Sequence, residues 1–319
     1  MLIKMQVGEQ DRGELQVNVT DSDNAPIRDA RVTISEPETA INPNSPIERL
    51  ETDVSGQTQI VDLNTPPLEY SLNENNENMP YANYNIQIEV PGYETENIRN
   101  VEILPDSLSL QNVRMRKREG EQVENIDIDP HTLYAEYPEK IPEDEIKDVN
   151  EPGEIVLSRV VIPEYVVVHN GTPSSNARDY YVTYKDYIKN VASSEIYATW
   201  PRATIEANVL AIMSFTLNRV YTEWYRNKGY DFTITSSTAY DQKWIYGRNI
   251  FQSIDEVVDE IFDQYLSRPD VRQPILTQYC DGKRVTCPNW LSQWGSCNLG
   301  EQGLGTLEII RNYYGDDIY

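Results

Sequence analysis

Residues 191–229 read VASSEIYATWPRATIEANVLAIMSFTLNRVYTEWYRNKG. Pro201 fits the first turn of a helix, because its ring fixes φ near a helical value and its missing N–H would have no partner there. Gly229 fits the position just past a helix end, where glycine adopts a left-handed conformation at little cost. The stretch therefore predicts one long helix between Pro201 and Gly229.

Further elements surround this stretch. Helices are predicted over Tyr184–Glu195, after Thr183, and over Thr306–Tyr314, before Gly315. A capping box at Ser253–Glu256 predicts another helix. Its apolar residues follow the i, i+3, i+4, i+7 spacing of an amphipathic helix: Ile254, Val257, Val258, Ile261, Phe262 and Leu266. Strand-like stretches lie between the helices, at Val161–His169, Phe232–Ile234 and Ile275–Tyr279. Residues 161–319 are therefore predicted to form an α+β domain.

The first half of the chain shows the pattern of strands. Apolar and polar residues alternate over Gly13–Thr20, Ala30–Ile34 and Tyr84–Val90, as in strands with one buried face. Turn sequences separate the strands: Asn24-Ala25-Pro26, Ser55-Gly56 and Pro91-Gly92. No stretch before residue 118 has convincing helical periodicity. Residues 1–117 are predicted to form an antiparallel β-sandwich.

Charge is distributed unevenly along the 319 residues. The chain holds 27 Lys+Arg and 52 Asp+Glu, a formal net charge of −25. This balance argues against nucleic acid and anionic lipid as partners, because both are bound through basic surfaces. Residues 1–160 carry a net charge of −20, whereas residues 161–319 carry −5 and all five tryptophans. The two halves are therefore predicted to do different work.

Residues 118–160 are predicted to be an acidic linker. Acidic residues recur along it, spaced by Pro130, Pro138, Pro142 and Pro152. Such a composition favours extended, solvated chain and is a natural place for proteolysis. A passive spacer explains the composition equally well.

Few side chains suit metal or thiol chemistry. The two histidines, His131 in the linker and His169 at a strand end, are far in sequence from the cysteines, so a Cys-His nucleophile has little support. Cys280, Cys287 and Cys297 lack zinc-site spacing and an obvious fourth ligand. Free thiols or one Cys280–Cys287 bridge fit better. No glycine-rich phosphate loop is present. We expect no metal and no cofactor.

The N-terminus, MLIKMQVGEQDRGELQ, has no apolar run of the length that a secretory signal needs. No stretch of 18 apolar residues occurs, so no membrane-spanning helix is predicted.

Glu195 is ambiguous when judged on its neighbours alone. Small, apolar and aromatic residues surround it over Val191–Trp200. Burial against such groups raises the pKa of a carboxyl, as a general acid requires. Most glutamates at helix ends are nonetheless solvated, so composition alone favours a solvated, structural Glu195.

The predicted strands of the first half resemble the carboxypeptidase-regulatory or transthyretin-like sandwich over residues 13–117. The residues that carry this resemblance are Leu15, Val17, Val19, Pro26, Ile27, Ala30, Val32, Thr52, Gly56, Gly92 and Tyr93. Such modules are usually non-catalytic, which implies an accessory role for this half.

The second half resembles the SpoIID/LytB domain family over residues 180–316. Val191–Trp200 and the following Thr204–Ala211 are similar to the family's Ala-Ser-Glu-Met-Pro segment and its next helix. Further similarities follow in order, at Asp241-Gln242, Tyr279-Cys280, Ser292-Gln293-Trp294-Gly295 and Leu307–Gly315. Two family histidines are missing, since Cys280 and Pro288-Asn289-Trp290 stand near their places. The resemblance therefore carries no metal site onto this chain.

This resemblance implies a lytic transglycosylase, which cleaves the MurNAc–GlcNAc bond of peptidoglycan and leaves a 1,6-anhydroMurNAc end. By its place in the motif, Glu195 is the expected acid/base. Expected substrate contacts come from Gln293, Trp294, Ser292, Tyr279, Trp200 and Gln242. Glu206 is interpreted as a helix-surface residue, and Trp224 and Trp244 as core residues.

The order of domains resembles that of the clostridial spore cortex-lytic enzymes. That resemblance implies a zymogen in the spore cortex or coat region, with peptidoglycan glycan strands and an activating germination protease as partners. Residues 1 to about 150 would then reduce activity. Such enzymes normally end in a peptidoglycan-binding domain, so we expect a truncated chain or a shorter relative. Two alternatives stay open: a non-catalytic peptidoglycan-binding module or enhancer of other cell-wall hydrolases, and a structural scaffold.

Overall fold

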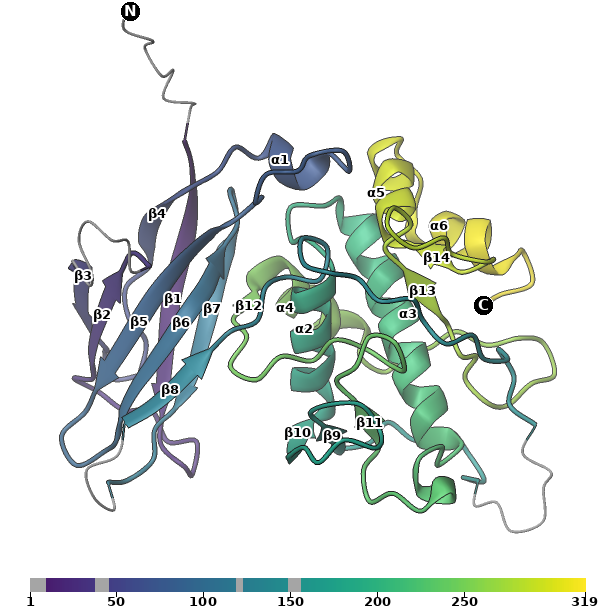
Figure 1. Ribbon diagram of the computed structural model, residues 1–319, viewed down its shortest axis with the longest axis horizontal. Helices are drawn as coiled ribbons and strands as arrows, with labels where there is room; N and C mark the ends of the chain where they lie inside the picture. The colour runs from purple at the N-terminus through teal and green to yellow at the C-terminus, as the bar shows by residue number, and fades with distance from the viewer. Residues whose placement is uncertain (1–9, 38–45, 119–122, 149–155) are drawn as a thin grey trace, which may run out of the picture. The chain divides into compact units, whose positions relative to one another are not determined.

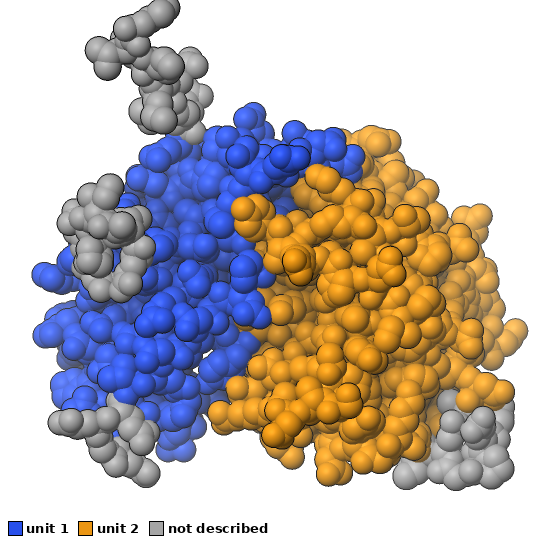
Figure 2. Space-filling model, in the orientation of Figure 1, with its two compact units in different colours: residues 1–130, 197–199, 246–253 blue, residues 131–196, 200–245, 254–319 orange. Residues whose placement is uncertain are grey.

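The computed structural model describes residues 10–37, 46–118, 123–148 and 156–319, which form a mixed α+β structure in two compact units. Unit 1 comprises residues 1–130, 197–199 and 246–253, and unit 2 the three remaining stretches (Figure 2). Two short stretches of the second half of the sequence are thus part of unit 1.

Unit 1 is built on two sheets (Figure 1). One has the order β12-β7-β1-β4 and the other β3-β2-β5-β6-β8. Their strands are β1 (Asp11–Thr20), β2 (Arg31–Ser35), β3 (Pro46–Glu51), β4 (Val61–Thr65), β5 (Ala82–Glu89), β6 (Thr95–Ile103), β7 (Leu108–Arg114), β8 (Val123–Asp127) and β12 (Ile250–Phe251). The predicted alternation is confirmed, since Leu15, Val17 and Val19 are buried on one face of β1.

Two features of unit 1 differ from the prediction. The sheets are not wholly antiparallel, because β1 pairs with β7 and β6 with β8 in parallel. A one-turn helix, α1 (Glu69–Leu72), also lies before residue 118, and it is too short to leave a periodic pattern in the sequence.

Unit 2 is organised around the buried helix α3 (Arg202–Tyr221), which packs against α2 (Tyr184–Glu195), α5 (Gln293–Glu301) and α6 (Thr306–Tyr314). Small sheets complete it: β10-β9-β11 and β13-β14. Their strands are β9 (Tyr165–His169), β10 (Asp179–Thr183), β11 (Ile234–Thr235), β13 (Tyr279–Cys280) and β14 (Leu291–Ser292). Within the described residues, no helix has both the length and the apolar character to span a membrane.

Local sequence signals predicted the bounds of two helices of unit 2 correctly. The structure confirms the helices over Tyr184–Glu195 and Thr306–Tyr314, the first capped by the Thr183 hydroxyl. α3, however, ends at Tyr221 rather than near Gly229. Glu223 takes a left-handed φ of 46°, which interrupts the helix, and Gly229 instead ends the separate 3-10 helix η1 (Arg226–Lys228).

The capping box at Ser253 is not formed. Helix α4 (Gln252–Ile261) already begins at Gln252, and the Ser253 hydroxyl donates to the carbonyl of Ala198, 3.2 Å away. The predicted apolar face holds in part, because Ile254, Val257 and Val258 are buried.

The predicted linker is largely part of the two folded units. Residues 123–127 form β8, which pairs with β6 in unit 1. From His131 onwards the chain packs in unit 2, where His131, Tyr137, Lys140 and Lys147 are buried. Some of its acidic residues are paired, as Glu143 is with Arg219 at 2.6 Å, whereas others such as Glu136 and Glu139 are exposed. Residues 119–122 and 149–155 of the linker lie outside the described residues.

A buried ion pair joins β6 to the 246–253 stretch within unit 1. Arg248 Nη1 lies 2.7 Å from Glu102 Oε1, and the two side chains are 0% and 1% exposed. Removing one partner of such a pair leaves an uncompensated buried charge, which typically costs about 3–5 kcal/mol.

We predict that Arg248→Met lowers the free energy of unfolding by about 3 kcal/mol or more. Arg31→Met is the matched control, because Arg31 and Glu89 are 64% and 47% exposed and 3.8 Å apart. That exposed pair contributes at most about 1 kcal/mol. Chemical denaturation measures both variants, and equal losses would contradict the importance of the Arg248 pair.

Candidate active site

Glu195 is the last residue of α2, and its carboxyl lies in the interior of unit 2. The chain leaves the helix at Ile196 in an extended conformation, and α2 buries Val191 to Glu195 without interruption. The Glu195 side chain is completely buried, although most glutamates at helix ends are solvated. A carboxyl in such a place needs hydrogen-bond donors or a proton.

Two groups donate to the Glu195 carboxyl. The Tyr279 hydroxyl lies 2.5 Å from Oε2, and the Lys243 backbone N–H lies 2.7 Å from Oε1. Gln293 holds the same residue from the main-chain side, since its Nε2 donates to the Glu195 carbonyl at 3.1 Å. Elements far apart in the sequence therefore fix the position of this one carboxyl.

Burial raises the pKa of Glu195 above its ordinary value, because the charged form loses its hydration. The positive charge of Lys140 and the bonds from Tyr279 and Lys243 act in the opposite direction but do not cancel the effect. Burial and the neighbouring Glu195 charge hold the pKa of Tyr279 well above its ordinary value, so its hydroxyl stays a donor. The Glu195 carboxyl therefore stays protonated to a higher pH than a glutamate in water does.

Lys140 is a site residue that the sequence did not reveal. Its ammonium donates to the Asp241 carbonyl at 2.8 Å and lies 4.3 Å from the centre of the Tyr279 ring. Burial lowers the pKa of this lysine, and the charges of Glu195 and Asp241 raise it in part. The acidic, proline-spaced sequence around Lys140 predicted solvated chain, so composition concealed it.

Two further buried carboxylates lie in unit 2, and both are fully bonded. Asp241 accepts from Arg219 at 2.7 Å, from Tyr225 at 2.6 Å, and from the backbone and hydroxyl of Thr235. Asp281 accepts from the backbone N–H groups of residues 283–285 and from the Arg284 side chain. Both carboxylates hold loops in place through these bonds.

The six residues predicted to contact the substrate have different surroundings in the structure. Gln242 is a core residue, because its Oε1 accepts from Tyr187 and Thr216 and its Nε2 donates to the Ile212 carbonyl. Ser292 caps α5 by accepting from the Gly295 N–H at 2.9 Å. Trp200 and Trp294 are buried and pack on each other with ring centroids 5.1 Å apart. Tyr279 and Gln293 are thus the two predicted partners that directly contact Glu195.

The cysteines and histidines occupy structural positions in unit 2. Cys280 and Cys287 form a disulfide, one of the two arrangements expected, and Cys297 is a buried free thiol. His169 bonds to Asp179 at 2.7 Å, whereas His131, expected in solvated linker, is buried. In the described part of the chain, no three His, Cys, Asp or Glu side chains are grouped to hold a metal ion.

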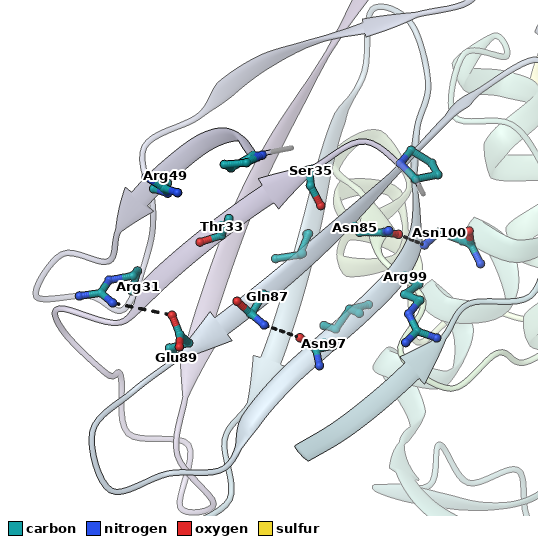
Figure 3. A pocket seen from close by; sticks show the side chains of 14 residues that line it. Arg31, Thr33, Ser35, Arg49, Asn85, Gln87, Glu89, Asn97, Arg99 and Asn100 are labelled. Carbon is teal, nitrogen blue, oxygen red and sulfur yellow. Dashed lines mark hydrogen bonds and ion pairs between the residues drawn. The ribbon is translucent and has the colours of Figure 1, made fainter. Parts of the chain in front are cut away.

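A polar hollow lies on the solvent face of the sheet in unit 1 (Figure 3). Its side chains bond across neighbouring strands, as Gln87 does to Asn97 at 2.9 Å and Arg31 to Glu89 at 3.8 Å. These groups are exposed or half-buried and paired with one another, and none of them is a buried acid or base. A buried acid elsewhere in unit 1 is Glu96, whose pKa burial and the neighbouring Glu124 raise to about 7.

Comparisons with known proteins do not identify a function for this chain. The sequence matches no protein-family model and no curated protein. Similar solved structures include GBS52, the minor pilin of Streptococcus agalactiae, at 17% identity and a TM-score of 0.25, covering 36% of this chain and 48% of that one. Wild-type catechol 1,2-dioxygenase of Acinetobacter radioresistens is 14% identical with a TM-score of 0.24, covering 37% and 58%. This chain thus spans about half the length of each. At TM-scores this low, the similarity indicates neither a shared fold nor a shared function.

We predict that the Glu195 carboxyl titrates above the ordinary glutamate range, and higher still in Lys140→Met, which loses the charge that favours the carboxylate. The carboxyl ¹³C shift of labelled glutamate, assigned with Glu195→Gln, measures both. Lys185→Met is the control, because Lys185 is 40% exposed and pairs with Asp259. A Glu195 pKa at or below the ordinary value, or no shift in Lys140→Met, would refute this electrostatic description.

Proposed function

We propose that this chain is a peptidoglycan lytic transglycosylase in which Glu195 is the single acid/base. The observation that carries the proposal is the completely buried Glu195 carboxyl, whose pKa burial raises and which forms no ion pair with any described residue. Inverting and most retaining hydrolases use two carboxylates, and the buried Asp241 and Asp281 are each tied to an arginine, whereas Glu195 is not.

The proposed reaction uses Glu195 twice. The neutral carboxyl protonates the oxygen that leaves MurNAc C1, and the C1–O bond breaks. The resulting carboxylate then takes the proton of the MurNAc 6-hydroxyl, whose oxygen bonds to C1 and closes the 1,6-anhydro ring. The proton returns to Glu195 and no water is consumed. A carboxyl with a raised pKa suits the first step, and the donors Tyr279 and Lys243 stabilise the carboxylate between the steps.

The assignment of residues follows the resemblance to the SpoIID/LytB family. We interpret unit 2 as a domain of that type and unit 1 as a sandwich of the carboxypeptidase-regulatory type. Gln293 and Tyr279 position Glu195, and Trp200 with Trp294 offers aromatic surface for sugar rings. Ser292 lies in the same motif as Gln293. Gln242 is left out, because its polar atoms are already bonded within the core.

We predict that Glu195→Gln lowers the rate of glycan cleavage by at least ~100-fold, the contribution typical of a positioned general acid. The protein is cut at a protease site inserted between residues 148 and 156 and assayed on spore cortex peptidoglycan over a dilution series. Mass spectrometry of the muropeptides counts the 1,6-anhydroMurNAc ends. Full activity of Glu195→Gln would overturn the assignment, and glycan binding without new ends would favour the alternative of a binding module or enhancer.

We further propose that the described fold is the latent form of a spore zymogen that a germination protease activates. Glu195 is closed to a glycan strand, because none of its surface is exposed. The segment from His131 contributes to this burial, and burial, together with the nearby charge of Glu195, holds the pKa of the Tyr137 hydroxyl well above its ordinary value. That hydroxyl is itself buried without a hydrogen-bond partner among the described residues, which makes the cover costly to hold in place.

We predict that Tyr137→Ala raises the rate at which the uncut chain releases muropeptides by roughly 100-fold, because removing a buried aromatic ring loosens the cover by about 3 kcal/mol and each 1.4 kcal/mol or so is a factor of ten. Tyr134→Ala is the control, since Tyr134 belongs to the same segment but is 41% exposed. If both variants stay as inactive as the wild-type chain, Tyr137 has no part in latency.

A further inference from the structure

We propose that cutting the chain between its two halves leaves a non-covalent complex, because residues 246–253 form a docking strand for the N-terminal half. This inference rests on the proposed zymogen. Activation then takes two steps: the chain is cut first, and the two pieces separate afterwards. The contacts that support it lie within unit 1, where residues 246–253 meet residues 10–130.

The docking strand extends a sheet. β12 pairs antiparallel with β7, with Ile250 opposite Leu110 and Phe251 opposite Ser109. β7 would otherwise be the edge of this sheet, because the strand order is β12-β7-β1-β4. Phe251 is completely buried, so the pairing combines backbone hydrogen bonds with an apolar anchor. Extended peptides commonly bind folded domains in this way, by adding a strand to an open sheet edge.

Residues 247–249, which directly precede β12, reinforce the pairing. The Asn249 amide accepts from the Glu102 N–H at 3.1 Å and donates to the Glu102 carbonyl at 2.8 Å, as a backbone partner would. Arg248 adds the buried ion pair with Glu102 and donates to the Asp129 carbonyl at 2.8 Å. Gln111 donates to the Gly247 carbonyl at 3.1 Å. None of these bonds depends on the covalent link between the halves.

A second seam holds the same two pieces together in unit 2. The segment ending at residue 148 stays with the N-terminal piece after a cut beyond it, and Glu143 pairs there with the buried Arg219 at 2.6 Å. Main-chain bonds also join it to unit 2, from Leu276 to the Glu145 carbonyl at 2.8 Å and from Ile141 to the Ala239 carbonyl at 2.9 Å. Cleavage therefore removes no contact at either seam.

Gly247 gives a sharp test of the docking strand. Its φ is +79°, and a Cβ placed there would lie 2.4 Å from Cγ2 of Ile126 on β8 of the N-terminal half. Gly229 has a φ of +85° and nothing within 4 Å of such a Cβ. Alanine at either position bears the same backbone strain, but alanine at 247 alone collides with the N-terminal half.

The experiment uses the full chain with a protease site inserted between residues 148 and 156. Size-exclusion chromatography with light scattering follows the cut protein over a dilution series. We expect the two wild-type pieces to co-elute at micromolar concentration. Gly247→Ala should weaken their association about ten-fold or more, the effect of about 1.4 kcal/mol. Gly229→Ala should leave it unchanged, and adding Ile126→Ala to Gly247→Ala should restore part of the affinity.

Two results would overturn the proposal. Wild-type pieces that elute separately at micromolar concentration would show that the seams do not hold the complex. An association equally affected by Gly247→Ala and Gly229→Ala would show that residues 246–253 are not the docking strand. Thermal unfolding of each uncut variant establishes that it folds. The readout needs no glycan cleavage, so failure here is distinct from failure of the proposed activity.

Discussion

Burial of the Glu195 carboxyl is the constraint around which unit 2 is arranged. Removing a carboxylate from water costs several kcal/mol unless donors, a counter-charge or a proton compensate. Here a tyrosine hydroxyl, a backbone N–H, the Lys140 ammonium and a raised pKa compensate together. Each comes from a different part of the chain, so the site requires a complete fold around it. This dependence accounts for the burial of Lys140 within an otherwise acidic and partly exposed segment.

Dependence on distant parts of the chain also separates the features that the sequence could predict from those that it could not. Thr183 and Gly315 mark helix ends through local chemistry, so both helices were predicted to the residue. Lys140 and β12 depend on partners more than a hundred residues away, Asp241 and β7, and no local pattern encodes such partners. Glu195 was singled out through its motif, whereas the motif position of Gln242 gave no sign of the core hydrogen bonds that it makes.

The two halves of the sequence are therefore more interdependent than their charge suggests. A net charge of −20 in residues 1–160 against −5 in the remainder predicted separate domains joined by a solvated linker. The structure instead exchanges segments, since residues 246–253 belong to unit 1 and residues 131–148 to unit 2. The N-terminal half therefore has residues in both units, and the zymogen that we propose depends on these shared contacts.

The central claim is that one buried carboxyl cleaves the glycan without water. Digestion of cortex peptidoglycan in H₂¹⁸O by the cut protein tests this claim most directly. The account predicts new MurNAc ends that are 1,6-anhydro and contain no ¹⁸O, because the 6-hydroxyl supplies the attacking oxygen. Reducing MurNAc ends that carry ¹⁸O would show that water attacks C1, and would contradict the single-carboxyl mechanism.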